Sequence, residues 1–214
     1  MLDRFALRLI QPAVRALARP LAATGISANT LTWGGFAMGM LGAALITQAA
    51  YGTALLAMVG SRLCDALDGA VARQTQPTDL GGFLDITLDF LFYAAIPLGF
   101  AVANPAENAL AAAVLLTTFI GTGSSFLAFA TLAAKRGVQD LATPGKSFYF
   151  LGGLTEGTET LAFFAAACVW PAHFAQLAYG FAALCGLTLA SRLRWGMQAF
   201  AAPAAPPPLE VIHD

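Results

Sequence analysis

The sequence predicts an all-α integral membrane protein: a bundle of six transmembrane helices with an amphipathic helix at the N-terminus that lies in the membrane interface. Of the 214 residues, 58% are hydrophobic and only 11% are charged, whereas charged residues make up roughly 25% of an ordinary soluble domain. Apolar stretches of about 20 residues recur along the chain, the length that crosses a ~30 Å hydrocarbon core. A soluble helical protein is the alternative, but too few polar residues are present to cover its surface.

Residues 2–19 predict the amphipathic helix. At 100° per residue, its arginines fall on one face and its large apolar residues on the opposite face. The basic face carries Arg4, Arg8, Arg15 and Arg19. This pattern suits a helix that lies on an anionic leaflet, and it also allows packing on the protein's own cytoplasmic surface.

Six spans follow, separated by turn and capping residues. They are expected at residues 31–49, 52–73, 80–103, 109–134, 147–169 and 173–194. Asn104-Pro105 and Trp170-Pro171 mark turns, Thr78-Asp79 caps the third span, and Thr143-Pro144-Gly145 precedes the fifth. The domain organisation is thus a juxtamembrane helix (1–25), one helical domain (26–198) and a disordered Ala- and Pro-rich tail (199–214).

The basic residues predict the orientation. The loops near residues 50, 105 and 171 carry no Lys or Arg, and nine of the eleven flank the termini or the two other loops. These nine are Arg4, Arg8, Arg15, Arg19, Arg73, Lys135, Arg136, Lys146 and Arg192. The positive-inside rule therefore places both termini and the 2–3 and 4–5 loops in the cytoplasm, with the protein in the cell or inner membrane. The net charge of −1 gives no indication of a nucleic-acid partner.

Three pairs of carboxylates are expected inside the spans. They are Asp65 with Asp68, Asp85 with Asp89, and Glu156 with Glu159. Spacings of three or four residues put each pair on one helix face. A charged side chain at the centre of a membrane span costs about 2.5–3.5 kcal/mol on insertion scales, so such residues mark function by default.

The four aspartates lie on antiparallel neighbouring spans joined by a short loop, so the two pairs should face each other at similar depth. Four carboxylates cannot all remain charged together without cations. Oxygen ligands without His or Cys select Mg²⁺, Mn²⁺ or Ca²⁺, and two ions ~3.5–4 Å apart would form the clamp used in phosphoryl transfer. Aspartates that merely hold helices together are the alternative, but Arg62 and Arg73 could neutralise at most two of them.

Small residues and a cation continue both aspartate stripes toward the cytoplasm. Gly69, Ala72 and Gly81 leave room for a ligand close to the backbone, and Arg73 can pair with a phosphate. The resulting pattern is Asp65-x2-Asp68-Gly69-x2-Ala72-Arg73-x7-Gly81-x3-Asp85-x3-Asp89. It resembles the signature of the CDP-alcohol phosphotransferases at all eight fixed positions. Residues 28–32, Ala-Asn-Thr-Leu-Thr, also resemble the P-N-x-x-T segment that opens the family's first span, with Ala28 in place of proline.

The resemblance implies transfer of a phosphatidyl-type group from a CDP-linked lipid, CDP-diacylglycerol, to an alcohol, with release of CMP. It implies two Mg²⁺ or Mn²⁺ ions on Asp65, Asp68 and Asp85. Asp89 would be the general base for the acceptor hydroxyl and a further ligand. Contacts with the cytidine diphosphate would come from Asp65, Gly69, Ala72, Arg73 and Gly81. The resemblance also implies that the protein forms a homodimer in the bilayer.

The acceptor is less determined. The small polar stretch 121–125 predicts either close helix packing or a groove for acceptor or lipid. Lys135, Arg136 and Lys146 are candidates for binding an acceptor phosphate, or simply loop cations. Glu156 and Glu159 could hydrogen-bond a polyol, bind an amine or pair with Arg62. Glycerol 3-phosphate or inositol phosphate is slightly favoured over an amino alcohol.

Two other functions also use aspartates in membrane helices. An intramembrane prenyltransferase binds Mg-diphosphate, but those enzymes resemble longer bundles with a different Asp spacing. A divalent-cation transporter would show pseudo-symmetric halves and acids near the midplane. Neither a repeat nor such a placement is visible in the sequence.

Overall fold

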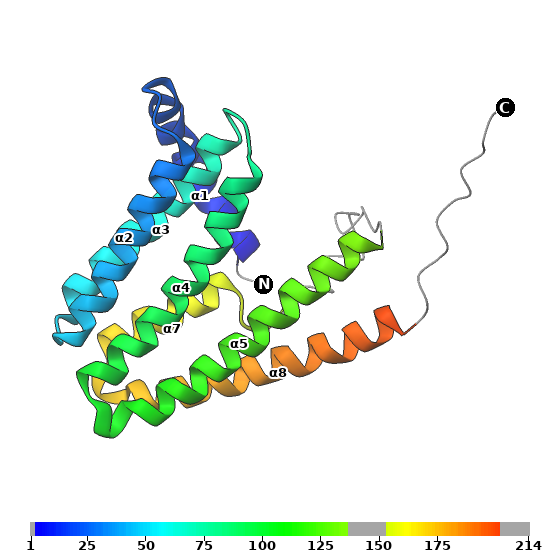
Figure 1. Cartoon of the computed structure of the whole chain (residues 1–214). Coiled ribbons are helices and arrows are strands. Elements are labelled where there is room, and N and C mark those ends of the chain that lie inside the picture. Colours follow the sequence, from blue (N-terminus) through cyan, green and yellow to red (C-terminus); the bar gives the residue numbers. More distant parts are fainter. Residues whose placement is uncertain (1–2, 137–152, 202–214) are drawn as a thin grey trace.

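The computed structural model describes residues 3–136 and 153–201, without the side chains of residues 3–10, 13 and 15 (Figure 1). All regular structure in these residues is helical. Within residues 3–136 and 153–201, four helical segments are long and apolar enough to cross a membrane. They are α2 (Ala28–Thr47), α4 (Asp79–Ala103), α5 (Pro105–Lys135) and Pro171–Phe200, which joins the short η1 (Pro171–His173) to α8 (Phe174–Phe200). Large apolar side chains such as Leu56, Leu110 and Ile120 remain at least 70% exposed, as lipid-facing residues do. The prediction of an all-α membrane protein is confirmed.

The helices α2 and α3 (Tyr51–Ala72) form a hairpin. The Ser27 side chain caps α2 by accepting a hydrogen bond from the Thr30 backbone N–H at 3.1 Å. A Cβ at Gly35 would lie 3.0 Å from Cβ of Cys64, so the missing side chain lets the two helices approach closely. Arg62, Asp65 and Asp68 lie in the C-terminal half of α3, from which Arg62 reaches Asp89 of α4.

Thr78 begins α4 as predicted, because its hydroxyl accepts a hydrogen bond from the Gly81 backbone N–H at 3.1 Å. The turn at Asn104-Pro105 is confirmed as well, since Pro105 is the first residue of α5. With 31 residues, α5 is about 46 Å long, longer than the expected span 109–134. It lies alongside α8, whereas α2, α3 and α4 pack together on the other side of the structure (Figure 1).

The helix α7 (Gly157–Val169) differs from the expected fifth span 147–169. It has 13 residues and is about 20 Å long. Glu156 precedes the helix in extended conformation as its N-cap, and Glu159 completes a reciprocal capping box. The prediction that the two glutamates share one face inside a transmembrane helix is therefore wrong: they satisfy N–H groups where the helix begins. Residues 143–145, Lys146, and most of the predicted tail lie outside the described residues.

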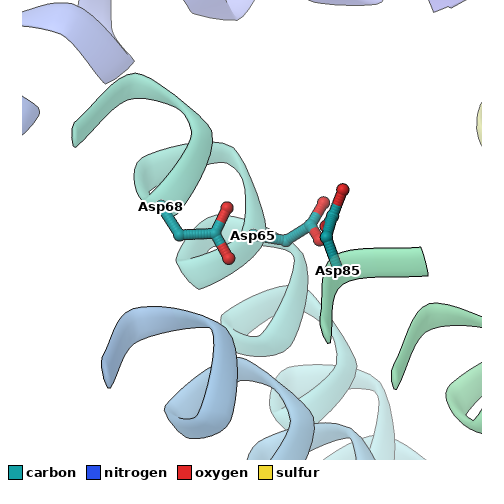
Figure 2. Close-up of side chains that lie close together, drawn as sticks. All are labelled: Asp65, Asp68 and Asp85. Carbon is teal, nitrogen blue, oxygen red and sulfur yellow. The ribbon is translucent and has the colours of Figure 1, made fainter. Parts of the chain in front are cut away.

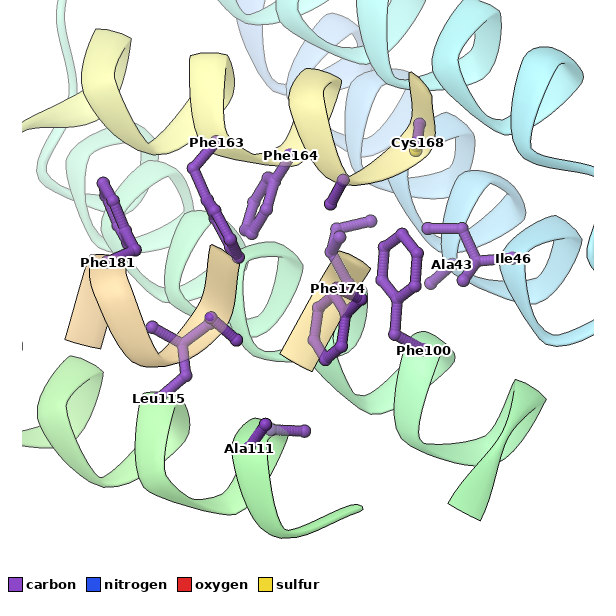
Figure 3. Packing of buried hydrophobic residues seen from close by; sticks show 14 of the residues in the cluster. Ala43, Ile46, Phe100, Ala111, Leu115, Phe163, Phe164, Cys168, Phe174 and Phe181 are labelled. Atoms are coloured by element: carbon purple, nitrogen blue, oxygen red, sulfur yellow. The ribbon is translucent and has the colours of Figure 1, made fainter. Parts of the chain in front are cut away.

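An apolar core that contains six phenylalanines joins α2, α3, α4, α5, α7 and α8 (Figure 3). Phe100 stacks on Phe174 at 4.3 Å between ring centroids, and Phe163 stacks on Phe181 at 4.7 Å. A smaller apolar cluster attaches α1 (Asp3–Ala23) to the end of α3 through Val14, Ala18, Ala70 and Val71. This contact is the second of the two arrangements that the N-terminal sequence allowed.

Candidate active site at the junction of α3 and α4

The structure brings three of the four aspartates together (Figure 2). Asp65 and Asp68 lie in the last two turns of α3, and Asp85 lies in the second turn of α4. One carboxylate oxygen from each lies within 4.8 Å of the others. Because α2 packs against both α3 and α4, Asp65 and Asp68 face Asp85 as the spacing predicted.

The chemistry of this cluster suits a hard divalent cation. Its donors are carboxylate oxygens, and opposite ligands around Mg²⁺ lie about 4.2 Å apart, so closure onto an ion requires only small side-chain movements. Asp68 is buried, and its Oδ2 accepts no hydrogen bond within the described parts of the chain. A buried carboxylate oxygen without a donor is costly, and an ion at this place would satisfy it.

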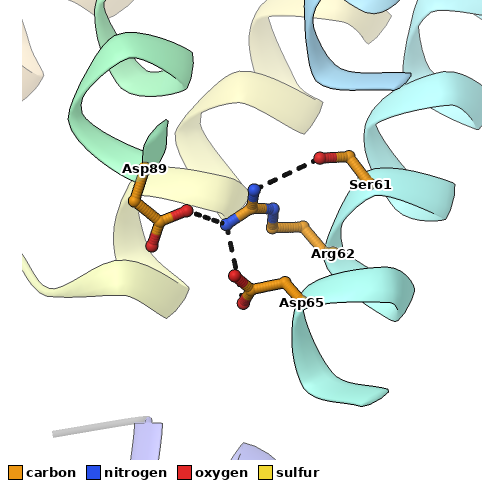
Figure 4. A network of polar contacts seen from close by, with 4 residues as sticks. All are labelled: Ser61, Arg62, Asp65 and Asp89. Atoms are coloured by element: carbon orange, nitrogen blue, oxygen red, sulfur yellow. Dashed lines mark hydrogen bonds and ion pairs between the residues drawn. The ribbon is translucent and has the colours of Figure 1, made fainter. Parts of the chain in front are cut away.

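Asp89 is not one of these three, because a cation holds it (Figure 4). Arg62 Nη1 donates a hydrogen bond to Asp89 Oδ1 at 2.7 Å and lies 3.7 Å from Asp65 Oδ2. Nη2 donates to Ser61 Oγ at 3.2 Å, and the guanidinium lies over the Phe92 ring, 4.3 Å from its centroid. Glu156 and Glu159, which were considered as partners of Arg62 from the sequence, do not take this place.

Beside the cluster lies a cavity of about 550 Å³. Gly69, Ala72, Arg73 and Gly81 line it together with Asp68 and Asp85. A Cβ at Gly81 would lie 3.2 Å from Thr78 Oγ1 and 3.3 Å from Asn29 Oδ1, so a side chain there would crowd the wall. A Cβ at Gly69 would lie 3.3 Å from Arg73 Nη1, which shows that the guanidinium folds back along α3. Asp65 does not line this cavity. It lies in the small adjoining space that the four aspartates and Arg62 line together.

The start of α2 contributes residues that were not assigned to the site from the sequence. Ser27, Asn29 and Thr32 line the same cavity, opposite the end of α3. Asn29 and Thr32 belong to segment 28–32, which resembles a family motif but was given no role in the site; no sequence signal indicated Ser27. Because α2 packs against α3, this motif forms part of the cavity wall.

A second cavity, of about 650 Å³, lies between α4, α5, α7 and α8. Phe90 and Tyr93 form its wall on α4, within one turn of Asp89. Part of the polar stretch 121–125 lines it through Thr122, Gly123 and Ser124. The stretch therefore borders a cavity, and Gly123 also permits close packing, since a Cβ there would lie 2.7 Å from the Phe90 ring.

The acceptor candidates separate around this second cavity. Glu156 lines it, whereas the Glu159 carboxylate caps α7 by accepting a hydrogen bond from the Glu156 backbone N–H at 3.2 Å. Lys135 is exposed at the end of α5. Arg136 donates to the backbone carbonyls of Ala199 and Phe200 at the end of α8, both at 3.2 Å.

Arg192 is the basic side chain that the structure places in this cavity, and sequence reasoning had treated it only as a topology marker. Its Nη1 donates to the Thr122 carbonyl at 2.8 Å. Arg192 and Glu156 thus bring opposite charges to one largely apolar cavity. The electrostatic interaction of each charge with a ligand is stronger there than at an exposed surface.

Comparison with known proteins identifies this arrangement. The family model for CDP-alcohol phosphatidyltransferase matches residues 25–195. The chain belongs to the CDP-alcohol phosphatidyltransferase family. It is therefore a membrane-embedded transferase of phospholipid synthesis, and the resemblance inferred from the eight-position motif is confirmed.

The relatives of this CDP-alcohol phosphatidyltransferase include inner membrane protein YnjF of Escherichia coli, 51% identical over 193 residues that cover 90% of this chain and 94% of YnjF. Archaetidylinositol phosphate synthase of Pyrococcus horikoshii is 38% identical over 106 residues, 49% of this chain and 55% of that protein. The crystal structure of Mycobacterium tuberculosis phosphatidylinositol phosphate synthase (PgsA1) with CDP-DAG bound matches with a TM-score of 0.67, covering 90% of this chain and 98% of that one. At 21% identity, the last likeness establishes the shared fold.

Proposed function

We propose that this chain transfers the phosphatidyl group of CDP-diacylglycerol to the hydroxyl of a small polar alcohol and releases CMP. The observation that carries the proposal is the placement of the carboxylate cluster at the edge of a 550 Å³ cavity whose wall is the Gly69–Arg73 and Gly81 stripe. The related fold with CDP-DAG bound supports the choice of donor. The family match favours this reaction over a prenyltransferase or a cation transporter.

The cytidine diphosphate is assigned to the larger part of this cavity. Arg73 supplies the positive charge for a phosphate, and the absence of side chains at Gly69 and Gly81 lets the ligand reach the helix backbones. Asn29 and Thr32 add hydrogen-bonding groups from α2. Asp65 and Ala72 complete the nucleotide contacts that we propose.

Asp65, Asp68 and Asp85 would hold a divalent ion, Mg²⁺ or Mn²⁺. A related structure contains manganese and citrate, and the oxygen donor set here suits either ion. Bound there, the metal would neutralise charge that develops on the diphosphate as CMP leaves. For the substrate-bound enzyme we propose two ions, with Asp89 as a ligand of the second.

Asp89 is assigned as the general base. In the substrate-free protein its Oδ1 accepts a hydrogen bond from Arg62. With substrate bound, one carboxylate oxygen would ligate the second ion and the other would accept the proton of the acceptor hydroxyl. The alcohol oxygen then bonds to the phosphorus that carries diacylglycerol, and the bond from that phosphorus to the oxygen of CMP breaks. A carboxylate is a sensible base here, because an alcohol is a poor nucleophile at neutral pH.

The acceptor is assigned to the second cavity, whose wall on α4 begins at Phe90, the residue after Asp89. Arg192 can bind a phosphate and Glu156 can hydrogen-bond hydroxyl groups, so a phosphorylated polyol suits the cavity better than an amino alcohol. Inositol phosphate and glycerol 3-phosphate are the two acceptors that we favour. Lys135, Lys146 and Arg136 remain candidates for guiding such an anion to the cavity.

The membrane arrangement that we propose has six spans, with α3 and the segment that includes α7 joining the four long apolar segments. Both termini and the aspartate end of α3 lie on the cytoplasmic side, with residues 1–25 in the interface, 26–198 as the catalytic domain and 199–214 as a tail. The distribution of Lys and Arg supports this orientation. We further propose a homodimer.

Purified protein in liposomes tests the reaction directly. CDP-diacylglycerol, Mg²⁺ or Mn²⁺ and single alcohols are supplied, and CMP release is measured. We expect release with inositol phosphate or glycerol 3-phosphate and none after chelation of the metal. No CMP with any alcohol, including serine and choline, would contradict the proposed reaction, and metal flux without CMP would favour a transporter.

A further inference from the structure

We propose that Arg62 acts as the second cation of the aspartate site in the substrate-free protein. Its guanidinium occupies the position beside Asp89, so the site binds one divalent ion while Arg62 stays in place and two when its charge is absent. The inference rests on the proposed metal site at Asp65, Asp68 and Asp85. It adds a positioning residue that separates Asp89 from those three.

The contacts of Arg62 show how the side chain is held (Figure 4). Asp89 lies on one side at 2.7 Å, Asp65 lies on the α3 side at 3.7 Å, and Ser61 accepts the other end of the guanidinium at 3.2 Å. Phe92 follows Asp89 by three residues on α4, so the same helix face offers a carboxylate and an aromatic ring. Arg62 therefore fixes the Asp89 carboxylate outside the three-aspartate cluster.

Burial makes this position stable. The Arg62 side chain is only 17% exposed, and both Ser61 and Phe92 are fully buried. Arg62 Nε is buried and makes no hydrogen bond within the residues described, so the two terminal nitrogens and the ring hold the group. A cation in a poorly solvated site stays beside its carboxylates, because leaving them would expose two unpaired charges.

Charge balance then sets the number of ions. With one divalent ion on the four carboxylates, Arg62 brings the net charge of the cluster to −1. A second ion on Asp89 would share that carboxylate with the guanidinium, and the two cations would repel each other at close range. When a neutral residue replaces Arg62, the four carboxylates with one divalent ion have a net charge of −2, and Asp89 has a free carboxylate oxygen. Both changes favour a second ion.

Mn²⁺ titration of the purified full-length protein without nucleotide tests the proposal, with bound ions counted by electron paramagnetic resonance. We expect one ion for the wild type and two for Arg62→Met and Arg62→Gln. Arg62→Lys keeps the positive charge and should retain one ion. Asp89→Asn should also retain one, because Asp89 is not a ligand of the first ion. Arg73→Met is the matched control on the same helix and should leave the count at one.

Each outcome is informative about a different assignment. No bound Mn²⁺ in the wild type would contradict the proposed metal site itself. Two ions in the wild type would leave that site intact and overturn the role of Arg62, as would a count of one in both neutral variants. If neither neutral variant can be purified, a wild-type count of two would still overturn the role of Arg62.

Discussion

Gly39 of α2 lies directly against the ring of Phe92 of α4. A Cβ at position 39 would lie 2.6 Å from Phe92 Cδ2 and 3.1 Å from Ser61 Oγ. Phe92 and Ser61 both contact the Arg62 guanidinium. The missing side chain on α2 therefore determines how Arg62 is held between α3 and α4.

Gly39→Ala should destabilise the helix bundle by about 1–3 kcal/mol, because the added methyl group overpacks a buried aromatic ring that has little room to move. The temperature of thermal unfolding in detergent is the measurement, and we expect it to fall. Gly34→Ala is the matched control on the same helix, since a Cβ at Gly34 meets nothing within 4 Å. An equal unfolding temperature for both variants would show that the packing at Gly39 is looser than described.

Asp89→Asn should lower the rate of CMP release by about 10²–10⁴-fold, the usual contribution of a general base. An amide cannot take the proton of the acceptor hydroxyl, but it can still accept the hydrogen bond from Arg62. Binding of CDP-diacylglycerol, measured by equilibrium titration, should be retained. Near-normal turnover in this variant would contradict the base assignment.

Asp68→Asn should weaken the binding of Mn²⁺ and CDP-diacylglycerol together, because it removes the buried carboxylate of the proposed metal site. We expect at least a tenfold higher metal concentration for half-maximal activity, read from metal titrations of CMP release. Asp79→Asn is the control, because Asp79 begins α4 but is exposed and outside the cluster. A shift of the same size in both variants would show a general effect of charge.

Arg192→Gln should raise the KM for a phosphorylated acceptor by roughly 10- to 100-fold, since a hydrogen bond to a charged group contributes about 1.5–3 kcal/mol. The KM for CDP-diacylglycerol should stay the same, because Arg192 lines the second cavity and not the first. Arg194→Gln, two residues further along α8, changes an exposed arginine that lines neither cavity and should change neither constant. A raised KM for the donor alone would place the acceptor elsewhere.

The aspartate site follows from local sequence rules. Spacings of three and four residues place Asp65 and Asp68 on one face of α3, and the short connection to α4 brings Asp85 opposite them. The Thr78 cap, which sets where α4 begins, was also predictable, because a hydroxyl before a helix satisfies its first N–H groups. These features depend on neighbours in the sequence or on one tight turn.

The remaining features depend on contacts between distant residues. Arg62 reaches Asp89 across 27 positions, and Arg192 reaches Thr122 across 70. No periodicity within one helix encodes such pairs. The start of α7 was missed for another reason: glutamates in an apolar window suggest a buried helix face, but the same side chains can cap a helix that begins there.

The two cavities are lined by different stretches of α4. Gly81, Gly82 and Asp85 face the cavity shared with α2 and α3, whereas Phe90, Tyr93 and Ala94 face the cavity shared with α5, α7 and α8. The residues that would select the donor thus precede Asp89 in the chain, and those that would select the acceptor follow it. A chimera that exchanges everything after Asp89 for the corresponding part of a relative should change the alcohol used and keep the nucleotide lipid. On the proposed assignment, we expect acceptor choice in this chain to be modular and open to recombination as a single block.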